Sequence, residues 1–224
     1  MNAKDSISQH SQWKTLAFER FMQIVKAPYG DFQAIWNLAS ALNDEEGFRR
    51  TVEFLSLHPL ARAAIQNRLL LGAIDLQQLH SLPSETLGHA YSDHLLRNSL
   101  NPIQSQTVEN DYDYLIAHLA EVHDIWHVVI NADTSMAGET KLQAFVAAQL
   151  RASRFSFAML AKNLLKAAVE DLDLAEQLMD ALAEGWRMGK QAYPLFGMQW
   201  NTLWDIPLIK LQAKWNLLPD TIAG

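Results

Sequence analysis

Apolar residues recur at steps of three and four positions through most of the chain, whereas runs of alternating β-branched residues are scarce. This spacing places apolar side chains on one face of an α-helix. Helix breakers and turn residues divide the chain into about eight or nine helices of ordinary length. The breaks lie at Pro28 to Gly30, Asn43 to Gly47, His58-Pro59, Leu82 to Ser84, Asn101-Pro102, Asn131 to Gly138 and Pro207. The pattern therefore predicts an all-α fold with almost no sheet.

The same pattern predicts one domain rather than two. No glycine-serine linker, charge block or low-complexity tract separates two halves of the sequence, and no repeat occurs at the periods of helical solenoids. With 224 residues, of which 49% are hydrophobic, the chain can bury a substantial core. We predict a single compact helical domain over residues 1–224.

Composition excludes several classes of chemistry and of partner. The chain has no cysteine, which removes disulfides, thiolate zinc sites and cysteine nucleophiles. Any metal site must therefore use His, Asp or Glu. The formal net charge of -7 argues against binding to a nucleic-acid backbone, which requires a basic face. We expect no nucleic-acid partner.

The sequence carries no recognisable targeting or membrane-spanning segment. Its first residues, MNAKDSISQHSQWK, have neither the apolar core of a secretory signal nor the Arg-rich pattern of a transit peptide. No stretch approaches the ~18 uninterrupted apolar residues of a membrane span, and the apolar run LLLGAI ends at Asp75. We expect a cytoplasmic protein, and the sequence leaves peripheral contact with a membrane open.

One strongly periodic helix carries the most informative side chains. We predict it from Asp111 to Asn131, because an apolar stripe of Tyr112, Leu115, Ile116, Leu119, Val122, Trp126, Val129 and Ile130 runs through this range. His123 and His127 lie one turn apart on the apolar side of that helix, so both imidazoles should point inward. Asp124 is only about 60° around the helix from His127, so its carboxylate can reach the same point.

A fourth polar side chain follows a short turn. Residues 131–138 are rich in cap-forming residues, and Glu139 opens the next amphipathic helix, ETKLQAFVAAQL. Two imidazoles and two carboxylates suit Zn²⁺, and Mn²⁺, Fe²⁺ or Mg²⁺ if waters complete the shell. The alternative is that both histidines are core residues hydrogen-bonded to carbonyls, with the acidic residue present for helix-dipole reasons. Spacing alone leaves both interpretations open.

HDxxH followed after eleven residues by Glu resembles the signature of the coenzyme Q (ubiquinone) biosynthesis family Coq-four. The segment LPSETLGHAYSDHL at 82–95 resembles the family's LP-x-x-TLG-x-x-Y motif, and EGWRMGKQAYPLFGMQWNTLWDIPLIKLQAKWNL resembles its tryptophan-rich closing stretch. The resemblance covers residues 82–217, and the residues before it match only loosely. It implies that the metal ligands are His123, Asp124, His127 and Glu139.

The resemblance also implies an all-α fold, a divalent metal taken to be zinc, and peripheral association with a membrane. It implies a prenylated quinone precursor or another isoprenoid lipid as ligand, contacts with other quinone biosynthesis proteins, and oxidative removal of the C1 carboxylate from the ring. An enzyme would need an open coordination position. Four protein ligands would instead close a tetrahedral zinc site and favour a scaffold, unless one ligand is displaceable. Asp124, short and adjacent to His123, is the ligand we expect to be loose.

Two related motifs are weaker matches. Zinc proteases carry HExxH, in which the glutamate is a general base, and the shorter Asp124 argues against that chemistry. HD-type phosphohydrolases are also helical, but they carry a small residue where this chain has Trp126. Such an enzyme would take a further upstream histidine from His89, His94 or His118.

Apolar and basic segments outside the motif have ordinary explanations. The Met- and aromatic-rich segments FSFAML (155–160) and YPLFGMQWNTLW (193–204) fit core better than the walls of a lipid pocket. Trp200 and Trp204 are four positions apart, the spacing of one helical turn. Two such side chains could form the seam of a homodimer or an anchor at a membrane interface. Mixed charge on an exposed helix face is the expected role of the basic residues Arg151, Arg154, Lys162 and Lys166.

Overall fold

The computed structural model describes residues 3–28, 31–42, 45–103, 108–151 and 154–218. These residues form α-helices and one 3₁₀ helix, with no strand among them, which confirms the predicted all-α fold. The elements are α1 (Ala3–Lys26), α2 (Phe32–Leu42), α3 (Glu45–Leu55), α4 (Pro59–Asn67), α5 (Leu76–His80), α6 (Leu87–Arg97), α7 (Asp111–Val129), α8 (Met136–Leu150), α9 (Arg154–Glu170), α10 (Leu172–Gln191), the 3₁₀ helix η1 (Trp200–Thr202) and α11 (Leu208–Lys214).

The described ranges contain eleven α-helices, so the predicted number of eight or nine was too low. The difference includes elements too short to show a period in the sequence. Helix α5 has 5 residues, held by the Asp75 side chain, which accepts hydrogen bonds from the backbone of Gln77 and Gln78. Of the predicted breaks, Tyr29, Gly30, Asn43 and Asp44 lie outside the described residues.

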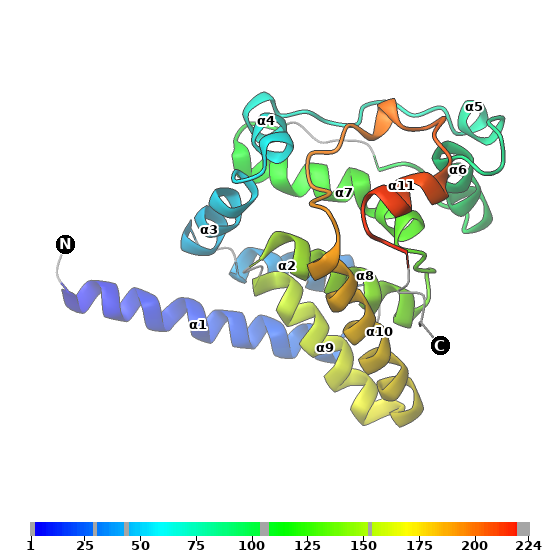
Figure 1. The fold of residues 1–224 in the computed structure, drawn as a ribbon. Helices are drawn as coiled ribbons and strands as arrows, with labels where there is room; N and C mark the ends of the chain where they lie inside the picture. The colour runs from blue at the N-terminus through cyan, green and yellow to red at the C-terminus, as the bar shows by residue number, and fades with distance from the viewer. Residues whose placement is uncertain (1–2, 29–30, 43–44, 104–107, 152–153, 219–224) are drawn as a thin grey trace.

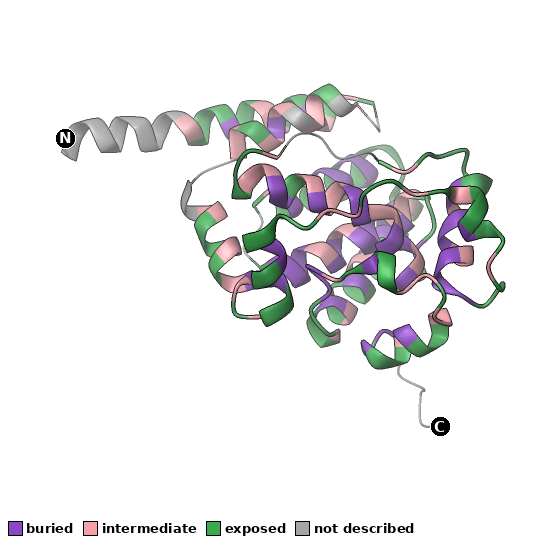
Figure 2. Ribbon diagram, turned by 90° about the horizontal axis from the view of Figure 1, so that it is seen from above, coloured by how far each residue is buried: buried purple, intermediate pink, exposed green. Residues whose placement is uncertain are grey.

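Helix α8 runs through the middle of the molecule (Figure 1). Of its 15 residues, 10 are buried, so the expected amphipathic pattern was wrong. The reason is its close contact with α10. A side chain at Gly185 would collide with the backbone of Lys141, so only glycine lets these two helices approach this closely. Figure 2 shows the buried residues concentrated in this central region.

Most of the remaining helices are arranged above and below α8. In Figure 1, α7, α6 and α11 lie above it, α9 and α10 lie below it, and α1 extends away from the body. Helix α1 packs against α2 and α9. Among the described residues, no helix is both long enough and apolar enough to cross a membrane.

Helix α9 presents its polar side inward and part of its apolar side outward. Lys162 and Lys166 are 4% and 8% exposed, which contradicts their predicted place on an exposed face. Lys166 donates hydrogen bonds to the Val25 carbonyl of α1 at 3.5 Å and to Glu170 at 2.8 Å. The prediction failed because α1 and α2 cover the polar side of α9. Phe157, Leu165 and Val169 are exposed instead.

Trp200 and Trp204 do not share a helical turn, because η1 ends at Thr202. Trp200 is 1% exposed and packs edge to face on Trp215. Trp204 stacks on Tyr91. Trp200 therefore belongs to the core and is not available for a dimer seam or a membrane anchor. The homodimer itself stays a prediction.

Candidate metal centre

Helix α7 forms as the apolar stripe predicts. The Asn110 side chain caps it by accepting hydrogen bonds from the backbone of Tyr112 and Asp113, and the last helical residue is Val129, two positions before the predicted end. Asn131 then adopts a positive φ of 52°, a conformation that Asn tolerates better than most residues. The chain therefore turns sharply just after the histidines.

The turn that follows is built around Asp133 and Ser135. Asp133 accepts a hydrogen bond from the backbone of Ser135, and the Ser135 hydroxyl caps α8 by accepting one from Gly138. Any side chain at position 138 would collide with Asp133, so glycine is required there. This cap starts α8 at Met136, three residues before the predicted start at Glu139. Glu139 consequently lies in the first turn of α8 and faces the end of α7.

The structure brings the predicted side chains together in two overlapping sets of three, in which the His123 and His127 rings adjoin Asp124 in one set and Glu139 in the other. The Nε2 atoms of His123 and His127 are 3.2 Å apart. The carboxylate oxygens of Glu139 lie 3.2 Å from the Nε2 of His127 and 3.8 Å from that of His123. Donor atoms of His123, Asp124 and His127 all lie within 4.8 Å of one another. We call His123, Asp124, His127 and Glu139 the HDE cluster.

These distances suit a single cation between the side chains. Ligand bonds of 2.0–2.1 Å in a tetrahedral zinc site place neighbouring donor atoms about 3.3 Å apart. The three Nε2 and carboxylate distances above bracket that value. His123, His127 and Glu139 therefore have the spacing expected of neighbouring ligands of one divalent metal.

The hydrogen bonds of His127 also favour a cation between the side chains. Its Nδ1 lies 3.2 Å from the Ala132 carbonyl, which can only accept, so Nδ1 carries the proton and Nε2 is left as an acceptor. The groups that face this Nε2 are a second imidazole nitrogen and a carboxylate. The Glu139 carboxylate and the His127 Nε2 are both acceptors, so they repel one another unless a proton or a metal ion lies between them. A carbonyl that fixes the outer nitrogen is also typical of metal-bound histidines.

In the absence of metal, a proton on His127 would supply that cation. Burial alone would lower the pKa of His127, but the hydrogen bond and the charge of Glu139 outweigh burial and raise it. For Glu139, burial favours a higher pKa, and the hydrogen bond from His127 reverses this and lowers it. Burial, followed by the adjacent His127, lowers the pKa of His123. The cluster therefore favours one positive charge at its centre.

Exposure divides the cluster into a closed and an open side. The His127 side chain is 1% exposed, whereas those of His123 and Glu139 are each 40% exposed. The prediction that both imidazoles point inward was therefore right for His127 and wrong for His123, which lies at the edge of the apolar stripe. A ligand can approach the cluster from this open side.

Residues 5–220 match the family described as "Coenzyme Q (ubiquinone) biosynthesis protein Coq4". The chain belongs to the Coq4 family. The family resemblance identified from the sequence is therefore confirmed. The match also reaches the first eighty residues, where sequence motifs gave little.

Curated members of the Coq4 family share about a quarter of their residues with this chain. The mitochondrial ubiquinone biosynthesis protein COQ4 homologue of Drosophila pseudoobscura pseudoobscura is 28% identical over 187 residues, which are 81% of this chain and 64% of that protein. The homologue of Danio rerio is also 28% identical, over 67% of this chain and 56% of its own length. The chain thus spans about three fifths of these relatives. Both are named as mitochondrial, and a cytoplasmic location of this chain stays a prediction.

A solved structure shares the fold. The crystal structure of a proposed ubiquinone biosynthesis protein from Nostoc punctiforme superposes with a TM-score of 0.82 and 24% sequence identity. The alignment covers 92% of this chain and 99% of that one. The helical arrangement described above is therefore also found in a solved protein.

One residue beside the cluster was not assigned from the Coq4 signature. His94 of α6 stacks on His127, with ring centroids 5.6 Å apart. Its Nε2 is buried and has no hydrogen-bond partner among the described residues. Burial, and then the neighbouring His127, lower the pKa of His94. The signature gave no signal for it, because α6 meets α7 only in the folded protein.

The other two upstream histidines lie elsewhere. His89 stacks on His80 and bonds to its carbonyl. His118 accepts a hydrogen bond from the backbone of Gly197 in the core. Of the three histidines that an HD-type phosphohydrolase could use, only His94 adjoins the cluster.

Proposed function

We propose that this Coq4 protein binds a divalent metal ion in the HDE cluster and holds a prenylated aromatic precursor of ubiquinone beside it. Zinc is the metal we propose, with magnesium, manganese and iron as the alternatives that the same ligands accept. The observation that carries the proposal is the meeting of two imidazole nitrogens and a carboxylate around one point, at distances of 3.2 to 3.8 Å.

The reaction we propose is removal of the carboxylate at ring carbon C1. The bond between C1 and the carboxylate carbon breaks and CO₂ leaves. In the oxidative form one atom of dioxygen is placed on C1, and the other leaves as water after taking two electrons and two protons from an external reductant, because zinc itself is not redox-active. A bound metal would stabilise the negative charge that develops on the ring. The partial exposure of His123 and Glu139 supports access of a substrate to the open side. We propose Asp124 as the ligand that yields its place.

His94 supplies a polar contact for that substrate. Its buried Nε2 has no hydrogen-bond partner among the described residues, and a buried nitrogen without a partner is costly. We propose that it hydrogen-bonds the carboxylate or phenol group of the precursor. His94 would thereby orient the ring against the cluster.

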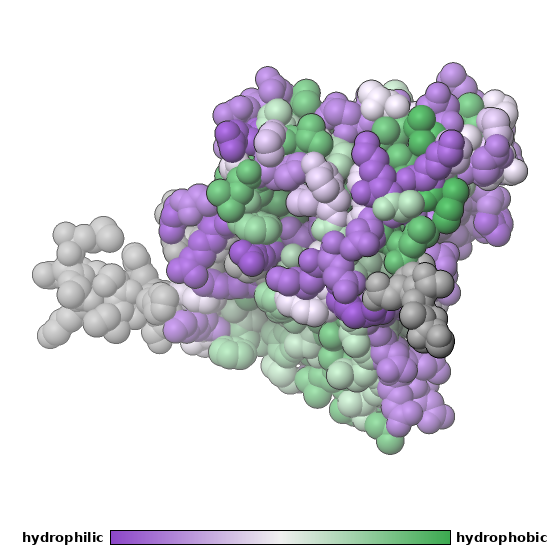
Figure 3. Space-filling view, viewed as in Figure 1, coloured by the Kyte–Doolittle hydropathy of each residue, from purple (hydrophilic) through white to green (hydrophobic). Residues whose placement is uncertain are grey.

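The exposed apolar residues of α9 and α10 would bind the prenyl tail and would make the peripheral contact with a membrane. Its exposed members include Phe157, Leu165, Val169, Leu172 and Met179, and hydrophobic residues gather in this lower part of the molecule (Figure 3). Contiguous exposed apolar surface typically marks an interaction site.

This apolar surface continues toward the metal end of α8. Met136 and Ala137, just before Glu139, pack with Leu164 and Leu174 in one apolar cluster. A tail that lies along α9 and α10 would therefore lead toward the HDE cluster. Of the two segments considered as pocket walls, 155–160 thus contributes to the surface, whereas 193–204 contributes the core residues Leu195 and Phe196.

A lipid-binding scaffold is the second candidate. All four proposed ligands are protein side chains from α7 and α8, a set that closes a tetrahedral shell and ties two helices together. In that role the protein would organise other quinone biosynthesis proteins around the bound precursor and catalyse nothing. The enzyme and the scaffold share the metal and the lipid but differ in turnover.

A turnover assay separates these candidates. Zinc-loaded protein is mixed with a prenylated 4-hydroxybenzoate in detergent under air, with and without a two-electron reductant such as ascorbate, and mass spectrometry follows loss of the carboxylate. The proposed enzyme forms the decarboxylated product, and a folded His127→Ala variant does not. Lipid binding without turnover in the zinc-loaded protein would indicate the scaffold. Phosphate release from phosphomonoesters would indicate an HD-type phosphohydrolase instead.

A further inference from the structure

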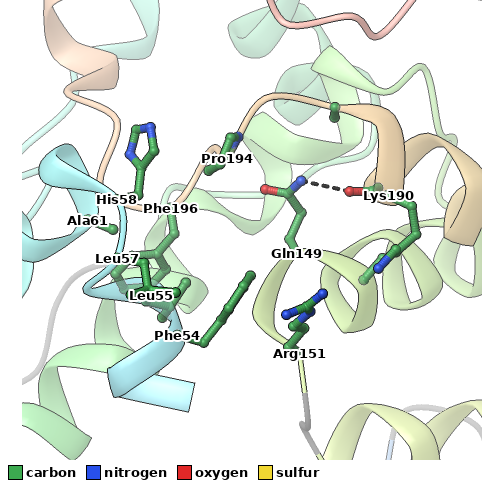
Figure 4. A pocket seen from close by; sticks show the side chains of 13 residues that line it. Phe54, Leu55, Leu57, His58, Ala61, Gln149, Arg151, Lys190, Pro194 and Phe196 are labelled. Atoms are coloured by element: carbon green, nitrogen blue, oxygen red, sulfur yellow. Dashed lines mark hydrogen bonds between the residues drawn. The ribbon is translucent and has the colours of Figure 1, made fainter. Parts of the chain in front are cut away.

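A pocket lined by Gln149 and Arg151 lies at the C-terminal end of α8 (Figure 4). It has a volume of about 320 Å³. Gln149 in its wall is ten residues after Glu139, which places it about 15 Å farther along the helix. None of the four HDE residues lines it. This pocket is therefore separate from the proposed metal centre.

The two sides of the pocket differ in chemistry. Leu55 and Leu57 lie on one side, and Arg151 and Lys190 lie on the other (Figure 4). No Asp or Glu occurs among the described residues that line it. In a chain with a formal net charge of -7, two cations without an acidic residue in the same pocket form a local positive site.

The floor between the two sides is fixed by Gln149, which is buried. Its side-chain nitrogen donates to the Gly189 carbonyl, and its oxygen accepts from the backbone of Leu195, each at 2.9 Å. These bonds join α8, α10 and the segment after α10. The pocket is therefore held in shape by the backbone around it, which favours binding without reorganisation.

Arg151 adopts a backbone conformation that favours glycine. Its φ is 48° and its ψ is 140°, a combination that is costly for residues with a side chain. Its guanidinium lies over the Phe54 ring, 4.9 Å from the centroid. An arginine at the end of a helix also interacts with the helix dipole, but a lysine or arginine within the last turn would do so without this strain.

We propose that this pocket binds a phosphate monoester carried on a short apolar group. Arginine presents a fork that matches phosphate geometry, and lysine adds a point charge, so the pair suits a dianion. Leu55, Leu57 and Phe54 would cover the apolar part. The volume lies at the lower end of the range for small-molecule pockets, so the apolar group is small. The inference is independent of the proposed metal and its chemistry.

The test uses the full chain and isothermal titration calorimetry with hexyl phosphate. Inorganic phosphate and hexanol are the comparison ligands, because each offers only one half of the proposed recognition. Hexyl phosphate should bind at least about tenfold more tightly than either, as expected when charged hydrogen bonds and apolar burial combine. Equal affinity for hexyl phosphate and hexanol would overturn the proposal.

A parallel experiment identifies the source of the monoester. Phosphatidylcholine vesicles with and without phosphatidic acid are tested for sedimentation with the protein. Because α9 and α10 are themselves proposed to contact membranes, the comparison is the increase in sedimentation caused by phosphatidic acid. Binding to hexyl phosphate with no such increase indicates a free soluble monoester. An increase that hexyl phosphate competes away indicates a lipid headgroup. Either result supports the shared phosphate chemistry.

Two variants separate a binding role from a structural one. Arg151→Gly removes both the cation and the unfavourable backbone conformation, so it should weaken hexyl phosphate binding about tenfold while the Tm rises. Leu57→Asp, at a side chain that is 74% exposed, should abolish binding without unfolding the protein. Ile209→Asp on α11, which is 57% exposed, is the matched control and should bind normally. Unchanged affinity in both pocket variants would overturn the proposal.

Discussion

The Nε2 atoms of His123 and His127 lie 3.2 Å apart and face each other across the open edge of α7. An i, i+4 pair on a helix can adopt this geometry, but two neutral imidazoles gain at most one hydrogen bond from it. Glu139 adds a negative charge next to both nitrogens. The arrangement is best stabilised by a cation shared among the three side chains.

Gly138 positions Glu139, and Gly138→Ala should disrupt the cluster without touching a ligand. A methyl group at this position collides with Asp133 in the turn before α8. We expect a loss of about 2 kcal/mol in the free energy of unfolding, typical of an overpacked site, and weaker zinc binding. Thermal unfolding with and without zinc measures both effects. Zinc affinity equal to that of the parent would show that the turn does not place Glu139.

His118 should make the protein sensitive to acid. Burial lowers the pKa of His118 to about 4, against about 6.5 in the unfolded chain. The unfolded state therefore binds the proton more readily, so stability is full above pH ~6.5 and falls as the pH approaches about 4. The loss attributable to this residue is about 3 kcal/mol at its full extent.

Urea denaturation of metal-free protein at several pH values tests this origin of the acid sensitivity. His118→Gln keeps an acceptor for the backbone N–H of Gly197 and removes the titration. The difference in free energy of unfolding between parent and variant should shrink as the pH falls from about 7 to about 4. A constant difference over this range would contradict the assignment.

His94→Phe tests the proposed contact with the precursor. Phenylalanine preserves an aromatic ring against His127 but removes the buried Nε2. We expect unchanged zinc content and about tenfold weaker binding of a prenylated 4-hydroxybenzoate, the loss expected for one hydrogen bond to a charged group. Tritiated ligand in a filter assay gives the affinity. A loss of zinc instead would make His94 a metal ligand.

The exposed residues of α9 and α10 should govern binding to bilayers. Val169 and Leu172 are 78% and 69% exposed, so Val169→Asp and Leu172→Asp should leave the fold intact. Each should reduce co-flotation with anionic vesicles, because a charge would enter the apolar region of the membrane. Ile209→Asp on α11 is the control and should float like the parent. Equal flotation of all variants would place the membrane contact elsewhere.

The sequence predicted those parts of the structure that depend on local spacing. The stripe of α7 predicted the inward position of His127 but not the partial exposure of His123, and cap-forming residues indicated the turn before Glu139. The predicted start of α8 was three residues too late, because the whole run 131–138 was assigned to the turn, whereas the Ser135 side chain caps the helix and Met136 to Gly138 already belong to its first turn.

Features that depend on contacts between elements distant in the sequence could not be predicted from local patterns. The sequence pattern predicted that Lys162 and Lys166 are exposed, whereas the packing of α1 and α2 on α9 buries them. Trp200 and Trp204 have helical spacing, but the chain between them leaves the helical path. The position of His94 depends on how α6 packs on α7, which no local pattern encodes.

The most direct test of the account is the metal content of the purified protein, measured by elemental analysis after incubation with zinc and removal of excess metal. The variants His123→Gln and Glu139→Gln alter side chains that are 40% exposed, so both should stay folded. His89→Gln, outside the cluster, is the control. The account predicts stoichiometric zinc in the parent and the control and its loss from both variants. A well-folded parent that retains no metal would contradict it and return these histidines to a purely structural role.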